Sequence, residues 1–91
     1  MNKQQREDLA KIHKRLDDVK TELDQLKGLI ETEQEAEQEK FDNIPEGLQQ
    51  GEKGQKIEEG ASELQTAVDG LDNIINELDD VLTAVDNATQ E

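Results

Sequence analysis

Residues 57–85, IEEGASELQTAVDGLDNIINELDDVLTAV, decide the fold of this chain. Apolar side chains recur in this stretch at alternating intervals of four and three residues, at Ile57, Ala61, Leu64, Val68, Leu71, Ile75, Leu78, Leu82 and Val85. Alternation of this kind puts all of these side chains on one stripe of an α-helix, the pattern of helices that pack lengthwise against a partner. It predicts a helix over about residues 54–87.

The N-terminal part of the chain repeats the pattern. Its apolar residues, spaced three and four apart, are Leu9, Ile12, Leu16, Val19, Leu23, Leu26 and Ile30. They predict a second helix over about residues 3–40. Pro45 and three glycines disfavour helix between the two, so residues 41–53 are expected to form a tip. The predicted fold is all-α, an antiparallel two-helix coiled-coil hairpin in one domain of residues 1–91.

Charges beside the two apolar stripes predict that the helices are antiparallel. The flanking row of the first helix holds Arg6, His13, Lys20 and Lys27, and that of the second holds Glu58, Gln65, Asp72, Asp79 and Asp86. These rows face each other only in an antiparallel pair, where opposite charges meet. The preferred register pairs Leu9 with Val85. A register shifted by one heptad, with Leu9 opposite Leu78, remains an alternative.

The second helix carries an additional apolar row, which consists of Ala67, Ile74, Val81 and Ala88. A single hairpin leaves this row exposed, and exposed apolar strips usually mark contact sites. We predict that the row is a self-association strip through which two copies form a four-helix bundle. A different partner protein, or tolerated exposure, is the alternative.

Two further surfaces are candidates for contacts. At the tip, Phe41, Ile44 and Leu48 are expected to fold inward beside Pro45 and close the end of the hairpin. The segment before the tip is poor in apolar residues and rich in carboxylates. It offers a candidate acidic contact surface made of Glu31, Glu33, Glu35, Glu37, Glu39 and Asp42.

The tip sequence FDNIPEGLQ, followed by GEKG, resembles a family of small acidic helical phage and prophage proteins of Gram-positive bacteria. Members carry an F/Y-D-N-I/M-P-E-S-L-Q element, a short S-E-R-G segment and an acidic helix. The chain departs from this pattern at Gly47, Gly51 and Lys53. The resemblance covers roughly the C-terminal two-thirds of the chain and implies a phage or prophage origin, without implying a particular activity.

The composition limits the classes of function. The net charge is −14, and residues 31–91 hold three basic against eighteen acidic residues, so direct binding to nucleic acid or to an anionic membrane is not expected. The chain has no cysteine and no apolar run of about 20 residues, so cysteine metal sites and a membrane-spanning helix are not expected either. We expect a soluble protein in the bacterial cytoplasm.

No arrangement of residues predicts catalysis. His13 is the only histidine and Ser62 the only serine, and no nucleophile, base and orienting group are brought together. We therefore expect no catalytic, cofactor or metal site, and a non-enzymatic protein–protein interaction or assembly module that forms a homodimer. The alternative is an acidic nucleic-acid mimic that inhibits a basic host defence protein, of the anti-restriction or anti-CRISPR type.

Overall fold

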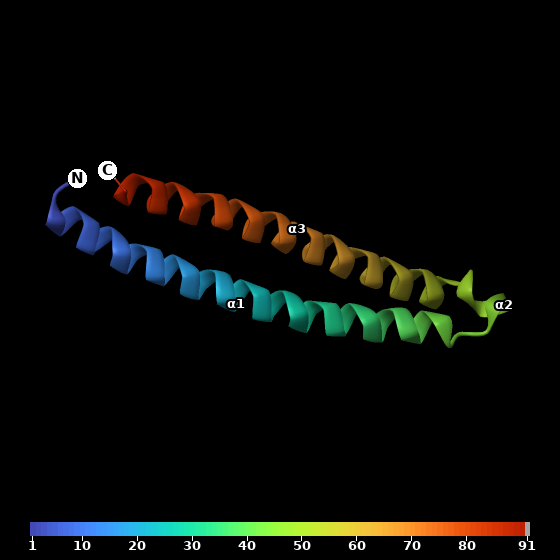
Figure 1. Ribbon diagram of the computed structural model, residues 1–91. Helices are drawn as coiled ribbons and strands as arrows, with labels where there is room; N and C mark the ends of the chain where they lie inside the picture. Colours follow the sequence, from blue (N-terminus) through green and yellow to red (C-terminus); the bar gives the residue numbers. More distant parts are fainter. Residues whose placement is uncertain (91) are drawn as a thin grey trace.

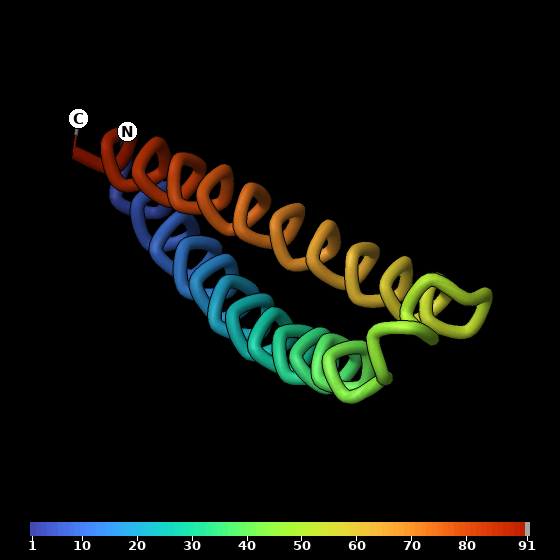
Figure 2. Tube along the Cα trace, turned by 90° about the vertical axis from the view of Figure 1, so that its right-hand side faces the viewer, coloured from blue at the N-terminus to red at the C-terminus, as the bar shows by residue number. Residues whose placement is uncertain are grey.

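A computed structural model, which describes residues 1–90, is a helical hairpin (Figure 1). Helix α1 (Lys3–Asp42) leads through a single turn, α2 (Glu46–Gln49), to helix α3 (Glu52–Thr89). The long helices run in opposite directions and lie side by side in both views, with the two termini at the same end (Figures 1 and 2). The predicted all-α hairpin is therefore confirmed, whereas the turn α2 was not anticipated.

The hairpin is a rod and has a thin core. Its extents are 68 × 15 × 13 Å and its radius of gyration is 20.3 Å, against about 12 Å for a compact domain of this length. The buried apolar residues of α3 lie seven residues apart and form one row, Ala61, Val68, Ile75 and Leu82. No residue of α1 is buried. Two helices alone thus bury only one row of apolar side chains.

The apolar stripe of α3 packs against α1 as predicted, but that of α1 does so only in part. Leu9, Leu16, Leu23 and Ile30 are partly covered. Ile12, Val19 and Leu26 are 42–49% exposed. The prediction that these three residues lie in the seam is wrong, because α1 is rotated so that its basic row lies against α3 instead.

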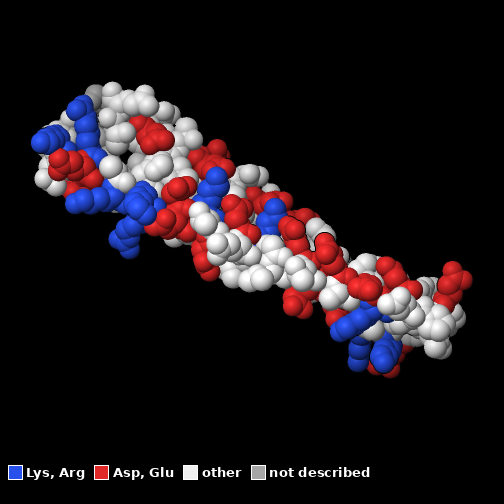
Figure 3. Space-filling view, turned by 60° about the horizontal axis from the view of Figure 1, so that its bottom comes forward, with Lys and Arg blue, Asp and Glu red and all other residues white. Residues whose placement is uncertain are grey.

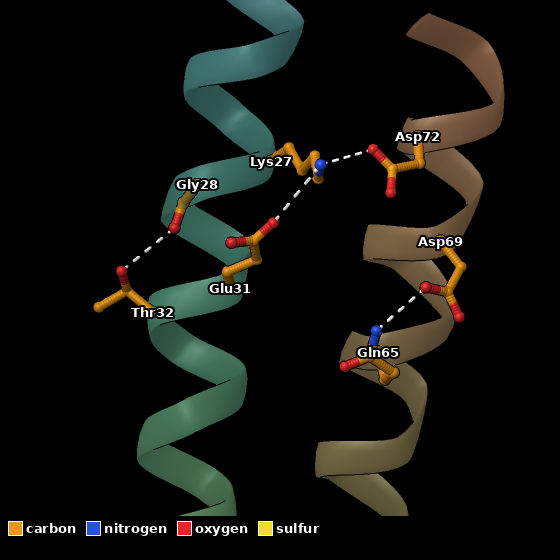
Figure 4. Close-up of polar contacts among 7 residues, drawn as sticks. All are labelled: Lys27, Gly28, Glu31, Thr32, Gln65, Asp69 and Asp72. Atoms are coloured by element: carbon orange, nitrogen blue, oxygen red, sulfur yellow. Dashed lines mark hydrogen bonds and ion pairs between the residues drawn. The ribbon is translucent and has the colours of Figure 1, made fainter. Parts of the chain in front are cut away.

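Three cross-helix ion pairs hold this rotation. His13 Nε2 lies 3.2 Å from Asp86 Oδ1, and Lys20 Nζ lies 2.6 Å from Asp79 Oδ1. Lys27 Nζ approaches both Asp72 and Glu31, as Figure 4 shows. The side chains of His13, Lys20 and Lys27 are only 24–30% exposed. Their aliphatic or ring parts therefore cover the α3 core row while their polar ends reach the acidic row.

The ion pairs support the preferred register. In the alternative, shifted by one heptad, His13 would lie nearer Asp79 than Asp86. Leu9 and Val85 also line one hollow near the termini, and Glu37 lies beside Gly60. These pairings agree with Leu9 opposite Val85, which places residue n of α1 across from residue 94 − n of α3. The cross-helix contacts of His13, Lys20 and Lys27 reach residues five positions beyond this relation, about one and a half helical turns.

The tip is built by hydrogen bonds to backbone carbonyls. Gln49 Nε2 donates to the carbonyl oxygens of Phe41 and Ile44, and so ties the α2 turn to the chain at the end of α1. Phe41 and Ile44 are partly covered, as expected. Leu48 is 64% exposed, so the expectation that it folds inward is wrong. The reason is that the α2 turn directs Gln49, and not Leu48, toward the end of α1.

Ile74 and Ile75 give a matched test of the packing, because they are adjacent and chemically identical. Ile75 is 7% and Ile74 49% exposed. Ile75→Ala should lower the free energy of unfolding by about 2–5 kcal/mol, and Ile74→Ala by less than about 1 kcal/mol. Urea denaturation at low protein concentration, followed by circular dichroism, measures both values. Equal losses would contradict the observed rotation of α3.

Gly54 and Gly70 test the tip in the same way. A Cβ on Gly54 would collide with the backbone of Gln49, whereas one on Gly70 would meet no atom within 4 Å. Gly54→Ala should therefore destabilise the hairpin, while Gly70→Ala should stabilise it by about 0.5–1 kcal/mol through helix propensity. Thermal unfolding measures the two shifts. A stabilising Gly54→Ala substitution would contradict the close approach at the tip.

The Lys20–Asp79 pair predicts a dependence on pH. The hydrogen bond to Asp79 raises the pKa of Lys20 above its ordinary value of 10.5. The stabilisation is thus complete below pH 10.5 and is lost as the pH rises through the raised pKa. Lys20→Met should lower the Tm at pH 7 and converge with the wild type at more alkaline pH. Lys14→Met, whose exposed partner Asp18 lies on the same helix, is the control and should have less effect.

Candidate interaction surface

The two open sides of the hairpin differ in chemistry. One side carries the three ion pairs described above. Successive residues of an α-helix are turned by 100°, so residues two apart point to nearly opposite sides. On α3, Val81 is therefore directed away from Asp79, and Ile74 away from Asp72. Ile74 and Val81 therefore lie on the side opposite the three cross-helix contacts.

Helix α1 adds apolar residues to this same side. Ile12, Val19 and Leu26 directly precede His13, Lys20 and Lys27 in the sequence. Successive residues are turned by 100°, so these three apolar residues flank the row of Leu16 and Leu23 on the side opposite the contacts with aspartates. We name the combined surface the apolar face and define it by the exposed residues Ile12, Val19, Leu26, Leu29, Ile74 and Val81. Their exposed fractions run from 42% to 64%.

The sequence located only the α3 part of the apolar face. In the predicted row, Ile74, Val81 and Ala67 are exposed, and Ala88 is partly covered. The α1 part was missed because the spacing of Ile12, Val19 and Leu26 is that of a packed seam. The available signal was the basic row, since cations that reach across to α3 must displace the neighbouring apolar row from the contact.

Two opposite charges border the apolar face on α1. Arg15 and Glu22 lie seven residues apart, in the same row as Leu29. Both are exposed, and neither has an ion-pair partner within the described hairpin. In Figure 3, uncharged side chains form a continuous area along the middle of the visible surface, with carboxylates beside it.

The candidate acidic surface is spread around α1. Its glutamates from Glu31 to Glu39 lie two residues apart, so each is turned by 200° from the one before. Glu31 contacts Lys27, and Glu37 Oε1 lies 2.7 Å from Lys40 Nζ and faces α3. Glu33, Glu35 and Glu39 are exposed, and Asp42 accepts a hydrogen bond from Gln38. The six carboxylates do not form one continuous face.

The tip offers a small hollow next to the exposed Leu48. Asn43, Ile44, Pro45 and the start of α3 line it. The predicted tip residues Phe41, Ile44 and Pro45 are thus held together by the turn, whereas Leu48 projects from it. Most of the tip motif consequently contributes to the local fold of the tip.

No catalytic or metal-ligating set is assembled in residues 1–90. His13 lies at the helix interface, and Ser62 is on the exposed surface of α3. No three His, Asp or Glu side chains of the described part converge as ligands for a metal ion. A separate observation concerns membranes: none of the described helices combines the length and the apolar character needed to cross one.

Comparisons with known proteins identify no relative. No family model matches the chain, and neither the curated proteins nor the solved structures contain a match.

Proposed function

We propose that this chain is a non-enzymatic protein–protein interaction and assembly module, in which the apolar face is the contact surface and a second copy is the partner. Two hairpins that pack through this face form a four-helix bundle. The tip motif supports a phage or prophage origin, and the module would then act in the cytoplasm of the host bacterium.

The observation that carries this proposal is the imbalance between buried and exposed apolar residues. The hairpin buries only four apolar side chains, and one of these is an alanine. It leaves six large aliphatic side chains about half exposed on a single face. Burying a large aliphatic side chain completely contributes about 1.5–3 kcal/mol, so covering each half-exposed one contributes about 1 kcal/mol. Association thus gives the thin hairpin a second core.

The alternative is a nucleic-acid mimic that binds a basic host protein. Its support is the unpaired charge on α3, where no basic residue follows Ile57 and only Asp72, Asp79 and Asp86 of the later residues make ion pairs in the described hairpin. The scattered carboxylates of residues 31–42 give it less support. A mimic would capture nucleic-acid-binding proteins from host lysate at low salt and release them at high salt.

Sedimentation equilibrium tests the proposed assembly. The wild-type chain should show twice its monomer mass of 10.2 kDa. Val81→Lys should shift the equilibrium to the monomer, because it would place a charge in the centre of the contact. Thr83→Lys adds the same charge at an exposed position outside the apolar face and should remain dimeric. Helical content should be retained in both variants.

A wild-type chain that stays monomeric at high concentration would rule out self-association. Equal weakening of the dimer by Val81→Lys and Thr83→Lys would assign the loss to net charge and would exclude the apolar face as the contact.

A further inference from the structure

We propose that the second copy lies on the apolar face with its long axis reversed, so that α1 packs on α1, α3 packs on α3, and each Arg15 meets Glu22 of the other copy. This inference rests on the proposed function and specifies the geometry of its dimer.

Apart from Leu29, the α1 part of the apolar face is symmetric about Val19. Ile12 and Leu26 lie seven residues on either side of it. When a copy is reversed about this point, Val19 faces itself and Ile12 faces Leu26. The α1 helices of the two copies then present apolar residues to each other along two full heptads.

The α3 part is symmetric about the same level of the rod. Reversal about the midpoint between Ile74 and Val81 exchanges these two residues. By the register of the hairpin, this midpoint lies across from residues 16–17 of α1, less than one turn from Val19. Side chains lean toward the N-terminus of their own helix, and in antiparallel helices this lean brings the two centres closer together. One twofold axis therefore serves both helices.

The bordering charges favour the same arrangement. Arg15 lies four residues before Val19 and Glu22 three residues after it, so reversal brings each Arg15 beside Glu22 of the second copy. Two ion pairs form, and they use charges that have no ion-pair partner among residues 1–90. Opposite charges at the border of an apolar contact commonly fix its orientation.

The competing arrangement places α1 on α3 of the second copy. Glu77 borders the apolar face on α3, one turn from both Ile74 and Val81, and the register puts it across from residue 17 of α1. It would therefore lie between Arg15 and Glu22 of the other copy. Its attraction to the arginine would be offset by repulsion from the glutamate, so this arrangement gains less from charge.

Single cysteines distinguish the two arrangements, because the chain contains none of its own. Val19→Cys should form a disulfide with itself under mild oxidation, since both sulfurs lie at the twofold axis within bridging distance. Leu26→Cys is the matched control and should not cross-link alone, but it should do so when mixed with Ile12→Cys. Non-reducing electrophoresis and mass spectrometry of the linked peptides measure the products.

Charge exchange provides a second readout that needs no cross-link. Arg15→Glu and Glu22→Arg should each raise the dissociation constant of the homodimer about tenfold or more, because like charges then meet twice. Mixing the two variants should restore opposite charges at both contacts and give a heterodimer with the affinity of the wild type.

Three results would overturn this inference. Cross-linking of Val19→Cys to Ile74→Cys, without Val19 self-linking, would establish the α1-on-α3 arrangement. A dimer that fails both to cross-link at Val19 and to respond to charge exchange would reject the reversed geometry and leave the proposed assembly intact. A wild-type chain that sediments as a monomer would reject the proposed assembly as well.

Discussion

The contact between the basic row of α1 and the acidic row of α3 is the constraint from which the other features follow. His13, Lys20 and Lys27 reach across to aspartates one heptad apart, and this fixes both the direction and the register of the helices. A charged row that lies against α3 occupies space that an apolar row would otherwise take. The same contact therefore makes the hairpin specific and leaves its apolar face open.

This arrangement explains why so little of the molecule is buried. The stems of the cations cover the α3 core row and replace leucine or isoleucine side chains in that role. Exposed ion pairs are weak individually and are screened by salt, so their main effect here is to exclude other registers. Stability then comes from one buried row, the partly covered leucines of α1 and the tip.

The sequence predicted the architecture well because its signals were long and periodic. Two runs of three-and-four spacing fixed the helices, Pro45 marked the turn, and opposite charges fixed the antiparallel direction. The rotation of α1 about its own axis was harder to predict from the sequence. In α1 the rows that contain Val19 and Lys20 both border Leu16, and a pattern alone does not say which of them faces α3. The short turn α2 was missed because glycines there suppressed the expectation of helix. Its stability comes from Gln49, whose side-chain bonds to Phe41 and Ile44 have no periodic signature.

Both termini lie at one end of the rod and the tip lies at the other (Figure 1). Tension applied between the two ends of the chain would therefore load the contacts between α1 and α3 one after another, from the termini toward the tip. Of the three contacts between charged rows, that of His13 and Asp86 would be loaded first. A structure loaded in this way peels open at low force, whereas helices sheared along their length resist together. If the hairpin were tethered by its termini, its helices would separate at low force from the end that carries the termini, and they would pair again from the tip.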